Sequence, residues 1–347
     1  MAAPETLAGV RLGGIGGERY ELISRLGSGQ FGSVWKAVDL DESAEVAVKL
    51  LHPATRPDAV LREAQLQRRL SEHPRIVGIR NVELGANPSS FVVLELLAGG
   101  SVQKLLDERR PTVRESHRWI RDVLEALDHA HREGVIHRDV KPSNLLLGSN
   151  GHALLTDFGV AEDSVRRAAL EPGMYRSIQP PELGRQPTNF QSDLWLVGIL
   201  AWQLLTGRRP DLEAAHAEKL LLPHRYSPEV PIALSRAVMT SLKVDPGERP
   251  ASAGRMLEDI ARVPVHSGWT EISSEDPAVC RIWQADNQGD HVIVQIQERP
   301  RGGFLVEGRA APGRRLRKRR RCVASTEAKA LIEARAWLTL VVGGGKL

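Results

Sequence analysis

The sequence predicts an α+β protein with two lobes, followed by a small domain of β-β-β-α type. Short runs rich in valine and alanine come first in the chain, and longer segments with helical periodicity follow them. A polar connector then separates the helical part from a second group of short strand-like runs. The length of 347 residues suits one large domain and one small domain.

The first lobe is expected to be a sheet with one helix. Residues 1–18 are rich in glycine and other small residues, and we predict a flexible lead-in there. Strands are predicted at residues 31–38, 45–51 and 90–96. Residues 58–71 have the spacing of an amphipathic helix.

The second lobe is expected to be mostly helical, with its longest helical patterns at residues 113–133 and 191–206. The longest apolar stretch, residues 194–205, is too short to cross a bilayer. The N-terminal residues lack the apolar core of a secretory signal. The two cysteines are too few for a disulfide framework and have no metal-binding spacing. We therefore expect reduced thiols and a cytoplasmic protein.

The chain changes character near residue 263. Residues 263–274 form a polar connector that we interpret as a linker, and residues 275–347 are interpreted as the small accessory domain. Its predicted strands are residues 279–284, 291–297, 303–307 and 322–324. Ser325 offers a hydroxyl cap and Glu327 an acid for the first turn of a helix that should run to about residue 341.

A dense basic segment lies within this small domain. Seven of the eight residues at positions 314–321 are basic: Arg314, Arg315, Arg317, Lys318, Arg319, Arg320 and Arg321. Such a segment could pair with the phosphates of a nucleic acid or with the carboxylates of an acidic partner. A solvated basic loop between strands explains the same composition, because charge runs alone are unspecific. The sequence leaves these interpretations open.

Glycines with a phosphate-binding spacing occur in the first lobe. Gly27, Gly29 and Gly32 place backbone without a Cβ where phosphates could approach closely. Dinucleotide-binding folds use a similar pattern, but there the loop opens a helix, whereas here the residues from Val34 onward continue as a strand. The next predicted strand contains Lys49, which by itself would be read as a solvated edge charge.

The strongest motif is the run His-Arg-Asp-Val-Lys-Pro-Ser-Asn at residues 137–144. An ordinary polar turn does not account for this combination. The triplet Asp-Phe-Gly at residues 157–159 follows at a fixed distance, directly after an apolar strand-like run. Three further matches come later in the chain, in segments that contain Glu182, Asp193 and Arg249.

These motifs resemble those of the protein kinase family, and most closely its bacterial-type, eukaryotic-like Ser/Thr members. The resemblance covers about seven tenths of the chain. It implies the two-lobed protein kinase fold for residues 19–262, with an N-lobe at about 19–97 and a C-lobe at about 98–262. It also implies ATP and Mg²⁺ as cofactors, protein substrates, and transfer of the γ-phosphoryl group of ATP to protein hydroxyls.

The family pattern implies roles for individual residues. Asp139 would accept the proton of the substrate hydroxyl, and Lys141 would contact the γ-phosphate. Lys49 would bind the α- and β-phosphates and pair with Glu63 on the next helix, despite a short connection between them. The metal ligands would be Asn144 and Asp157.

The same resemblance implies an ATP site and a supporting framework. The ATP-binding residues would be Leu26, Gly27, Gly29, Gly32, Val34, Ala47, Lys49, Glu95, Leu97 and Leu146, with Leu94 as gatekeeper. The structural residues would be His137, Arg138, Glu182, Asp193 and Arg249. Within this framework Asp193 would brace the catalytic loop, and Glu182 would form a buried ion pair with Arg249.

The segment at residues 159–182 departs from the family pattern, because it contains no threonine. Ser164 and Ser177 are its only serines and are the candidate regulatory phosphosites. Three acids could take the place of a phosphate near Arg138. These acids are Glu162, Asp163 and Glu171. We therefore hypothesise that activity depends weakly or not at all on phosphorylation of this segment.

Two other functions remain open on sequence grounds. The irregular segment at residues 159–182 would suit an ATP-binding scaffold whose C-terminal domain binds a partner or nucleic acid. A small-molecule kinase of related fold is a weaker alternative, because the segments around Glu182 and Arg249 favour protein substrates. The complete set of catalytic residues favours an active protein kinase over both.

Overall fold

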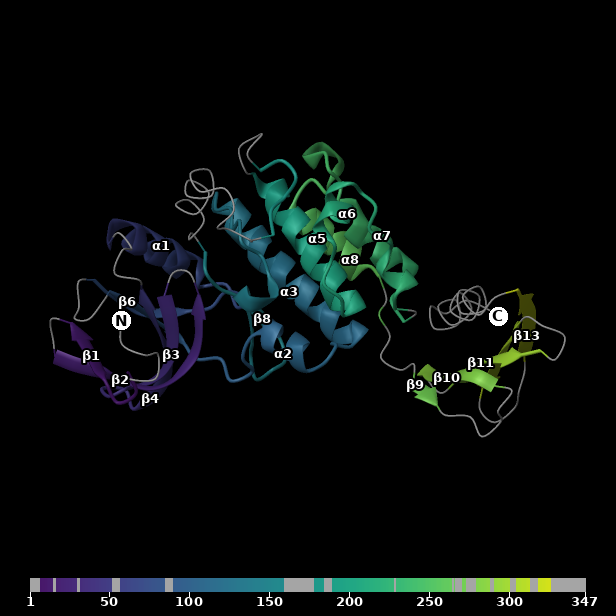
Figure 1. Ribbon diagram of the computed structural model, residues 1–347, viewed down its shortest axis with the longest axis horizontal. Coiled ribbons are helices and arrows are strands. Elements are labelled where there is room, and N and C mark those ends of the chain that lie inside the picture. The colour runs from purple at the N-terminus through teal and green to yellow at the C-terminus, as the bar shows by residue number, and fades with distance from the viewer. Residues whose placement is uncertain are drawn as a thin grey trace.

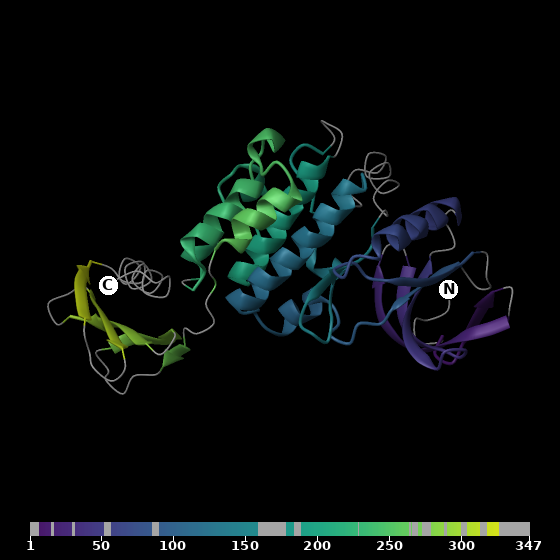
Figure 2. The same cartoon turned by 180° about the vertical axis from the view of Figure 1, so that it is seen from behind.

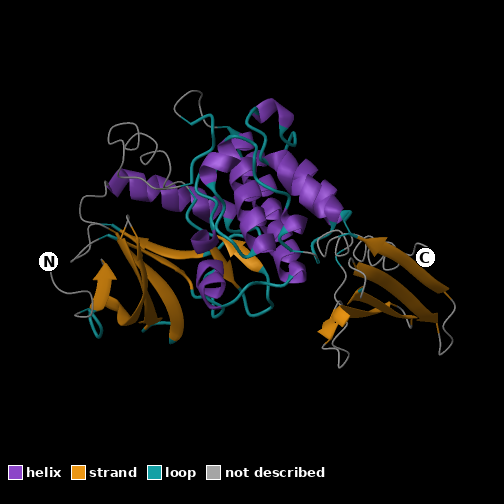
Figure 3. Cartoon of the chain, turned by 45° about the vertical axis from the view of Figure 1, so that its right-hand side comes forward, coloured by secondary structure: helices purple, strands orange, loops and turns teal. Residues whose placement is uncertain are grey.

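The computed structural model describes residues 7–14, 17–29, 32–51, 57–84, 90–158, 178–183, 189–227, 229–263, 265, 270–272, 279–287, 290–299, 304–312 and 318–325. In chain order these residues form a strand-rich N-lobe, a helical C-lobe and a further antiparallel sheet (Figure 1). Figure 3 shows the strands of the N-lobe on one side of the central helices and the further sheet on the other. The predicted two-lobed α+β fold is confirmed.

The N-lobe is a six-stranded antiparallel sheet with strand order β1-β2-β3-β4-β6-β5 and one helix, α1. The strands are β1 Arg11–Gly14, β2 Gly17–Gly29, β3 Gly32–Asp39, β4 Ala44–Leu51, β5 Ile79–Glu83 and β6 Phe91–Glu95, and the helix is α1 Pro57–Leu70. Strands β3, β4 and β6 and the helix fall close to their predicted ranges. Strands β2 and β5 have no counterpart in the sequence prediction.

Strand β1 corrects the prediction of a flexible lead-in at residues 1–18. It pairs with β2 in antiparallel register, with Leu12 opposite Tyr20. Both side chains are 1% exposed and belong to one apolar cluster of the sheet. Burial of Leu12 therefore orders a segment whose glycine-rich composition suggested flexibility. Residues 1–6, 15 and 16 of the predicted lead-in lie outside the described residues.

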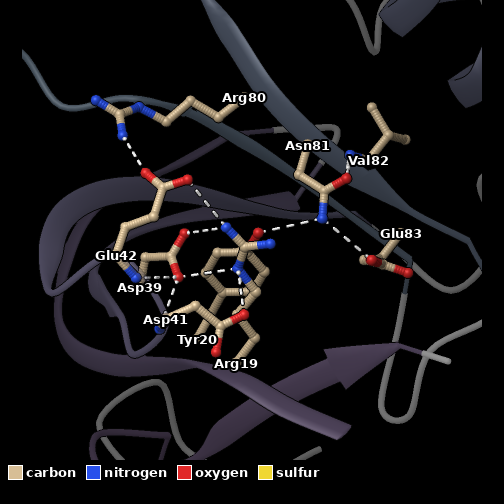
Figure 4. A network of polar contacts seen from close by, with 9 residues as sticks. All are labelled: Arg19, Tyr20, Asp39, Asp41, Glu42, Arg80, Asn81, Val82 and Glu83. Atoms are coloured by element: carbon tan, nitrogen blue, oxygen red, sulfur yellow. Dashed lines mark hydrogen bonds and ion pairs between the residues drawn. The ribbon is translucent and has the colours of Figure 1, made fainter. Parts of the chain in front are cut away.

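A network of ion pairs links strand β2, the end of β3, the β3–β4 turn and strand β5 of this sheet (Figure 4). Arg19 on β2 donates two hydrogen bonds to the buried Asp39 carboxylate, at 2.9 and 2.7 Å. It also contacts Glu42 in the β3–β4 turn, at 3.2 Å, and Glu42 accepts a bond from Arg80 on β5. The hydrogen bonds from Arg19 lower the pKa of Asp39. The network thus joins three segments of the sheet.

The C-lobe is built around two long helices. Its described helices and 3-10 turns are α2 Val102–Glu108, α3 Val113–Arg132, η1 Pro142–Asn144, α5 Phe190–Thr206, α6 Leu212–His216, η2 Pro223–Arg225, α7 Ile232–Ser241, η3 Pro246–Glu248 and α8 Ala253–Ala261. Fifteen of the seventeen residues of α5 are buried, as an all-round apolar helix requires. Helices α3 and α5 pack together in the centre of the lobe (Figure 2). Both lie within one residue of their predicted ranges.

The C-terminal sheet has five antiparallel strands in the order β13-β12-β11-β10-β9. They are β9 Thr270–Ile272, β10 Val279–Asn287, β11 Asp290–Glu298, β12 Phe304–Pro312 and β13 Lys318–Ala324. Strand β9 lies within residues 263–274, the range predicted as a linker, and has no counterpart among the predicted strands. The predicted helix after Ser325 lies outside the described residues. Within the described residues, no helix combines the length and the apolar character that crossing a membrane requires.

Candidate active site

The glycine-rich segment forms the hairpin between β2 and β3. In its register Gly27 lies opposite Val34, and Gly29 lies opposite Gly32. Gly32 has φ +145°, and a Cβ there would collide with the backbone carbonyl of Leu50 on β4. A Cβ at Gly27 would meet no atom within 4 Å. Gly32 is therefore required by the fold, whereas the space at Gly27 is free for a ligand.

An apolar cluster lies behind this hairpin. Its buried members are Ala47, Leu51, Val77, Val92 and Leu94, and its partly buried members include Val34, Leu97 and Leu146. The structure thus brings together four of the predicted ATP-binding residues and the predicted gatekeeper. Leu26 is 52% exposed and lies outside this cluster. The carboxylate of Glu95, at the end of β6, accepts a hydrogen bond from the Gly78 backbone amide at 3.0 Å.

Lys49 lies on β4 and extends toward the Asp-Phe-Gly segment. Its ammonium contacts the Asp157 carboxylate at 2.8 Å, and the Lys49 side chain is 10% exposed. Burial raises the pKa of Asp157, but the charge of Lys49 and its hydrogen bond outweigh that effect, and the pKa lies below its ordinary value. Glu63, the predicted partner of Lys49, lies in α1, and its side chain is outside the described part of the chain.

The hairpin of β7 Leu145–Leu147 and β8 Ala153–Leu155 positions both halves of the metal-binding pattern. Leu145 pairs with Leu155, so Asn144 precedes one strand and Thr156 follows the other. The Thr156 amide donates to the Asn144 carbonyl at 3.0 Å. The hairpin therefore fixes the catalytic loop beside Asp157, although the two segments are separate in sequence.

Asp139 accepts hydrogen bonds from two other residues of the motif at residues 137–144. Lys141 Nζ lies 2.6 Å from Asp139 Oδ2, and Asn144 Nδ2 lies 3.0 Å from the same oxygen. Asn144 Nδ2 also donates to the Asp139 carbonyl at 2.8 Å. These contacts fix the rotamers of all three side chains. The Asp139 side chain remains 27% exposed, so a substrate could reach it.

Asp193 holds the start of the catalytic loop from beneath. It is fully buried in α5 and accepts hydrogen bonds from the amides of His137 and Arg138, at 2.8 and 2.7 Å. Arg138 has φ +67°, a conformation that non-glycine residues rarely adopt. His137 contributes a second tie, because its Nε2 lies 3.0 Å from the Thr156 carbonyl. The two hydrogen bonds from these backbone amides to Asp193 therefore hold a strained backbone in place next to Asp139.

A buried ion pair links the end of the 159–182 segment to the C-lobe. Arg249 donates to both carboxylate oxygens of Glu182, at 2.9 and 2.8 Å, and the side chains are 0% and 4% exposed. Ser192 Oγ donates to the same carboxylate at 2.7 Å. Burial raises the pKa of Glu182, but the hydrogen bonds from Arg249 and Ser192 outweigh that effect. The pKa of Glu182 therefore lies below its ordinary value.

The donor atoms suit a magnesium ion. Because Asn144 Nδ2 donates to Asp139, the amide oxygen Oδ1 is directed away from Asp139. Among the described residues, it accepts only a long 3.5 Å contact from Ser143. The Asp157 side chain is 32% exposed and ionised. One carboxylate and one amide oxygen, completed by phosphates, form a typical magnesium site. Among the described residues, no cluster of three or more His, Cys, Asp or Glu side chains forms a separate metal centre.

Two contributors to the site were not predicted from the sequence. His131 on α3 lies with Nε2 2.8 Å from Asp193 Oδ2, so it completes the set of groups around that carboxylate. Ser192 shares the carboxylate of Glu182 with Arg249. No sequence pattern marks either residue as part of the site. His131 acts through Asp193 and Ser192 acts through Glu182, and these contacts arise only when the chain folds. Ser164 and Ser177 lie outside the described residues.

Comparison with known proteins agrees with this geometry. Residues 20–245 match the family model described as a protein kinase domain. A probable serine/threonine-protein kinase PknB of Lactococcus lactis is 30% identical over 272 residues, covering 73% of this chain and 43% of its own length. Serine/threonine-protein kinase PknD of Mycobacterium tuberculosis is 31% identical over 293 residues, covering 77% and 42%.

PknB of Mycolicibacterium smegmatis is similar to the same part of the chain, with 31% identity over 274 residues that cover 72% of this chain and 43% of the relative. The chain thus spans about two fifths of the length of these curated relatives. The matched region contains the N-lobe sheet from Tyr20 onward, most of the C-lobe and the motifs at residues 137–144 and 157–159. The chain belongs to the protein kinase family, among relatives of the bacterial Ser/Thr type.

Proposed function

We propose that this chain is an active Ser/Thr protein kinase that transfers the γ-phosphoryl group of Mg-ATP to serine or threonine hydroxyls of proteins. One arrangement carries this proposal. Asp139, Asn144 and Asp157 lie together in the cleft, with Lys49 bonded to Asp157 and Lys141 bonded to Asp139. Such sites act mainly by positioning groups and balancing charge, and every group needed for that is present.

The geometry suggests which oxygen of Asp139 takes the proton. Oδ2 already accepts bonds from Lys141 and Asn144, so we assign Oδ1 as the acceptor. The substrate oxygen forms a bond to the γ-phosphorus, the bond from that phosphorus to the β,γ-bridging oxygen breaks, and the hydroxyl proton passes to Asp139 Oδ1. Lys141 would hold the transferring group, and Lys49 would hold the other phosphates.

We assign Asn144 Oδ1 and the Asp157 carboxylate as the metal ligands. When bound, Mg²⁺ would neutralise charge on the phosphate oxygens. Lys49 fits this assignment, because its contact with Asp157 keeps that carboxylate ionised and oriented. We also assign Val34, Ala47, Leu97 and Leu146 to the adenine site, because they form one apolar cluster.

Phosphate transfer from labelled Mg-ATP tests the proposal on the full chain. The wild-type protein should phosphorylate serine or threonine, and Asp139→Asn should lower the rate by about 10²–10⁴-fold, the usual contribution of a general base. Asp107→Asn, on the exposed surface of α2, is the matched control and should retain full activity. Mass spectrometry of the products would also show whether Ser164 or Ser177 is modified.

The alternative of an ATP-binding scaffold predicts a different result. Such a protein would bind Mg-ATP yet transfer no phosphate to any protein substrate, and Asp139→Asn would change nothing measurable. Transfer to small-molecule hydroxyls alone would instead favour a small-molecule kinase. Treatment with a phosphatase tests the hypothesis of weak dependence on loop phosphorylation, which requires that activity survive the treatment.

We further propose that the basic segment of the C-terminal sheet meets an anionic partner in the cytoplasm. In the register of β12 and β13, Arg309 lies opposite Arg319, and the neighbouring residues of β13 are also basic. Clustered arginines attract nucleic acids or acidic proteins. Arg314, Arg315 and Arg317 belong to the same segment and lie outside the described residues.

Binding of a labelled DNA duplex and of a labelled polyglutamate peptide would test this partner. Affinity for either should fall steeply with salt, because paired counterions are released. Replacing Arg319 and Arg321 by glutamine should weaken binding and flatten the salt slope. Affinity that does not respond to salt or to these replacements would exclude the basic segment as the contact.

A further inference from the structure

A groove lies in the C-lobe, between the segment that follows α6 and the C-terminal end of α7, helices that lie close to each other in Figure 1. Its volume is about 450 Å³, which would hold two or three side chains. None of its lining residues belongs to the catalytic cleft or to the apolar cluster behind the glycine-rich hairpin. The groove is therefore a separate feature of the lobe.

The lining of the groove is largely apolar. Leu220 and Leu222 line it from the α6 side, and Met239 and Leu242 line it from the α7 side. Leu221, between the first two, is 55% exposed, and Val244, directly after Lys243, is 36% exposed. Methionine and leucine side chains adapt to apolar groups of different shape. These features suit apolar side chains of another polypeptide.

The wall of the groove is held in a fixed shape. The carboxylate of Glu218 lies 2.6 Å from Lys243 Nζ and accepts the amide of Val244 at 2.9 Å. Glu218 itself has φ +54°, a backbone conformation rarely adopted by glutamate. These bonds join the segment after α6 to the segment after α7. A preformed wall lowers the conformational cost of binding.

Among the described residues that line the groove, one charged side chain, Arg236, is not in an ion pair. Glu218 and Lys243 pair with each other, and the carboxylate of Glu248 lies 3.8 Å from Lys243 Nζ. The Thr240 hydroxyl donates to the Arg236 carbonyl at 3.1 Å. Arg236 lines the groove, is exposed, and takes part in no ion pair among the described residues. A small polar metabolite would need several converging polar groups, which this lining does not supply. One free cation beside an apolar floor fits an apolar segment that carries a carboxylate.

We propose that this groove docks a short segment of the protein substrate that presents leucine-like side chains next to an aspartate or glutamate. The identity of the partner as a substrate rests on the proposed kinase function. The apolar side chains would lie on the floor formed by Leu222, Met239 and Leu242, and the carboxylate would pair with Arg236. Such docking would raise the local concentration of the phosphorylated serine or threonine at Asp139 without altering the chemical step.

Direct binding to the full chain tests the groove independently of catalysis. The probes are fluorescein-labelled peptides that carry two leucines and one aspartate at several spacings, with matched peptides in which lysine replaces the aspartate or serine replaces the leucines. Fluorescence anisotropy should show a preference of at least about tenfold for a leucine–aspartate peptide, and Arg236→Glu should reverse the charge preference. Arg121→Glu, an exposed arginine on α3 outside the lining, should leave binding unchanged.

The same peptide fused to a serine-containing acceptor separates docking from catalysis. Fusion should lower KM by about tenfold with kcat unchanged, and Arg236→Glu should abolish that gain but keep the kcat of the unfused acceptor. Equal binding of all three peptides, or a fusion with unchanged KM, would overturn the groove proposal while the kinase function stands. Binding without any phosphate transfer would overturn the kinase function while the groove stands.

A second copy of this chain is the competing occupant. Sedimentation velocity would show a wild-type dimer that Arg236→Glu converts to monomer, and the labelled peptides would then fail to bind. That combination of results would overturn substrate docking. A monomeric wild type that binds the leucine–aspartate peptide would support it.

Discussion

At the scale of single residues, two glycines of one loop serve different physical purposes. The backbone of Gly32 has φ +145° and passes against the Leu50 carbonyl, so the fold itself excludes a side chain. Gly27 has open space around the position of a Cβ. Packing within the described structure therefore does not require a glycine there, which is consistent with the proposal that Gly27 lies in the ATP site.

We expect Gly27→Ala and Gly32→Ala to separate folding from nucleotide binding. Gly32→Ala should destabilise the protein by about 1–3 kcal/mol from backbone strain alone. Gly27→Ala should leave the thermal midpoint unchanged and raise KM for ATP several-fold, because its methyl group would occupy space near the phosphates. Thermal denaturation and initial rates measure the two effects. Equal KM values for Gly27→Ala and wild type would remove Gly27 from the ATP site.

At the scale of elements, the Glu182–Arg249 pair joins the end of the 159–182 segment to the turn at η3. Both side chains are buried, so the loss of one leaves the other charge without compensation. Arg249 also donates to the carbonyls of Lys243, Gln191 and Val244. One guanidinium thus joins three segments of the chain, at Glu182, at Gln191 and at residues 243–244.

Arg249→Met should therefore cost about 3–5 kcal/mol, the usual range for breaking a buried pair. The double variant with Glu182→Gln should recover part of this loss, because no unpaired carboxylate remains. Urea denaturation of the full chain measures both, and a double-mutant cycle gives the coupling. Additive effects of the two substitutions would show that the pair does not act as a unit.

The start of α3 gives a prediction about pH. Hydrogen bonds from Arg109 lower the pKa of Glu115 to about 2, and Glu115 forms a capping box with Thr112. A lowered pKa in the folded state means that ionised Glu115 stabilises the protein above its ordinary pKa of 4.5. That contribution is lost as the pH falls from about 4.5 toward about 2.

Glu115→Gln should thus lower the thermal midpoint at pH 7, and the difference from wild type should shrink below about pH 4.5. Thr112→Ala should cost about 1 kcal/mol at the same helix end, because it removes the cap itself. Part of that cost should also fade below about pH 4.5, because the Thr112 hydroxyl donates to Glu115 and helps to lower its pKa. Glu108→Gln, an exposed residue at the end of α2, serves as the control. A difference for Glu115→Gln that stays constant with pH would contradict the assignment.

At the scale of the whole molecule, the site lies between lobes that fold around different cores. Lys49 comes from the N-lobe sheet, and Asp139, Asn144 and Asp157 come from the C-lobe. The contact between Lys49 and Asp157 joins the lobes at the place assigned to the phosphates. Nucleotide binding should therefore stabilise the whole kinase domain.

Mg-ATP should raise the thermal midpoint, with a stabilisation of about 2.7 kcal/mol at a concentration one hundred times Kd. Asp139→Asn should keep this response, because we assign Asp139 to the substrate hydroxyl. Lys49→Met should lose it, and Lys36→Met, which removes a lysine from β3 that pairs with Glu45, should keep it. A full ATP response in Lys49→Met would contradict the role of Lys49.

Much of this architecture follows from local sequence. The alternation of β3, the apolar run of β4, the helical spacing of α3 and α5 and the motifs at residues 137–144 and 157–159 are encoded in short windows, because neighbouring residues set those patterns. The strand β1 escaped prediction, since the burial of Leu12 against the sheet depends on distant residues. Strand β9 escaped prediction for the same reason, because it is specified by pairing with β10.

By itself the sequence determined the chemistry: which carboxylates, amide and lysines are available, in which order, and hence the family. Only the tertiary structure decided how they act together. It placed Asp193 and His131 beneath the catalytic loop, left Leu26 outside the apolar cluster and built the groove beside Arg236. The physical reason is that chain order fixes local conformation, whereas contacts between distant segments form only when both lobes bury their apolar surface.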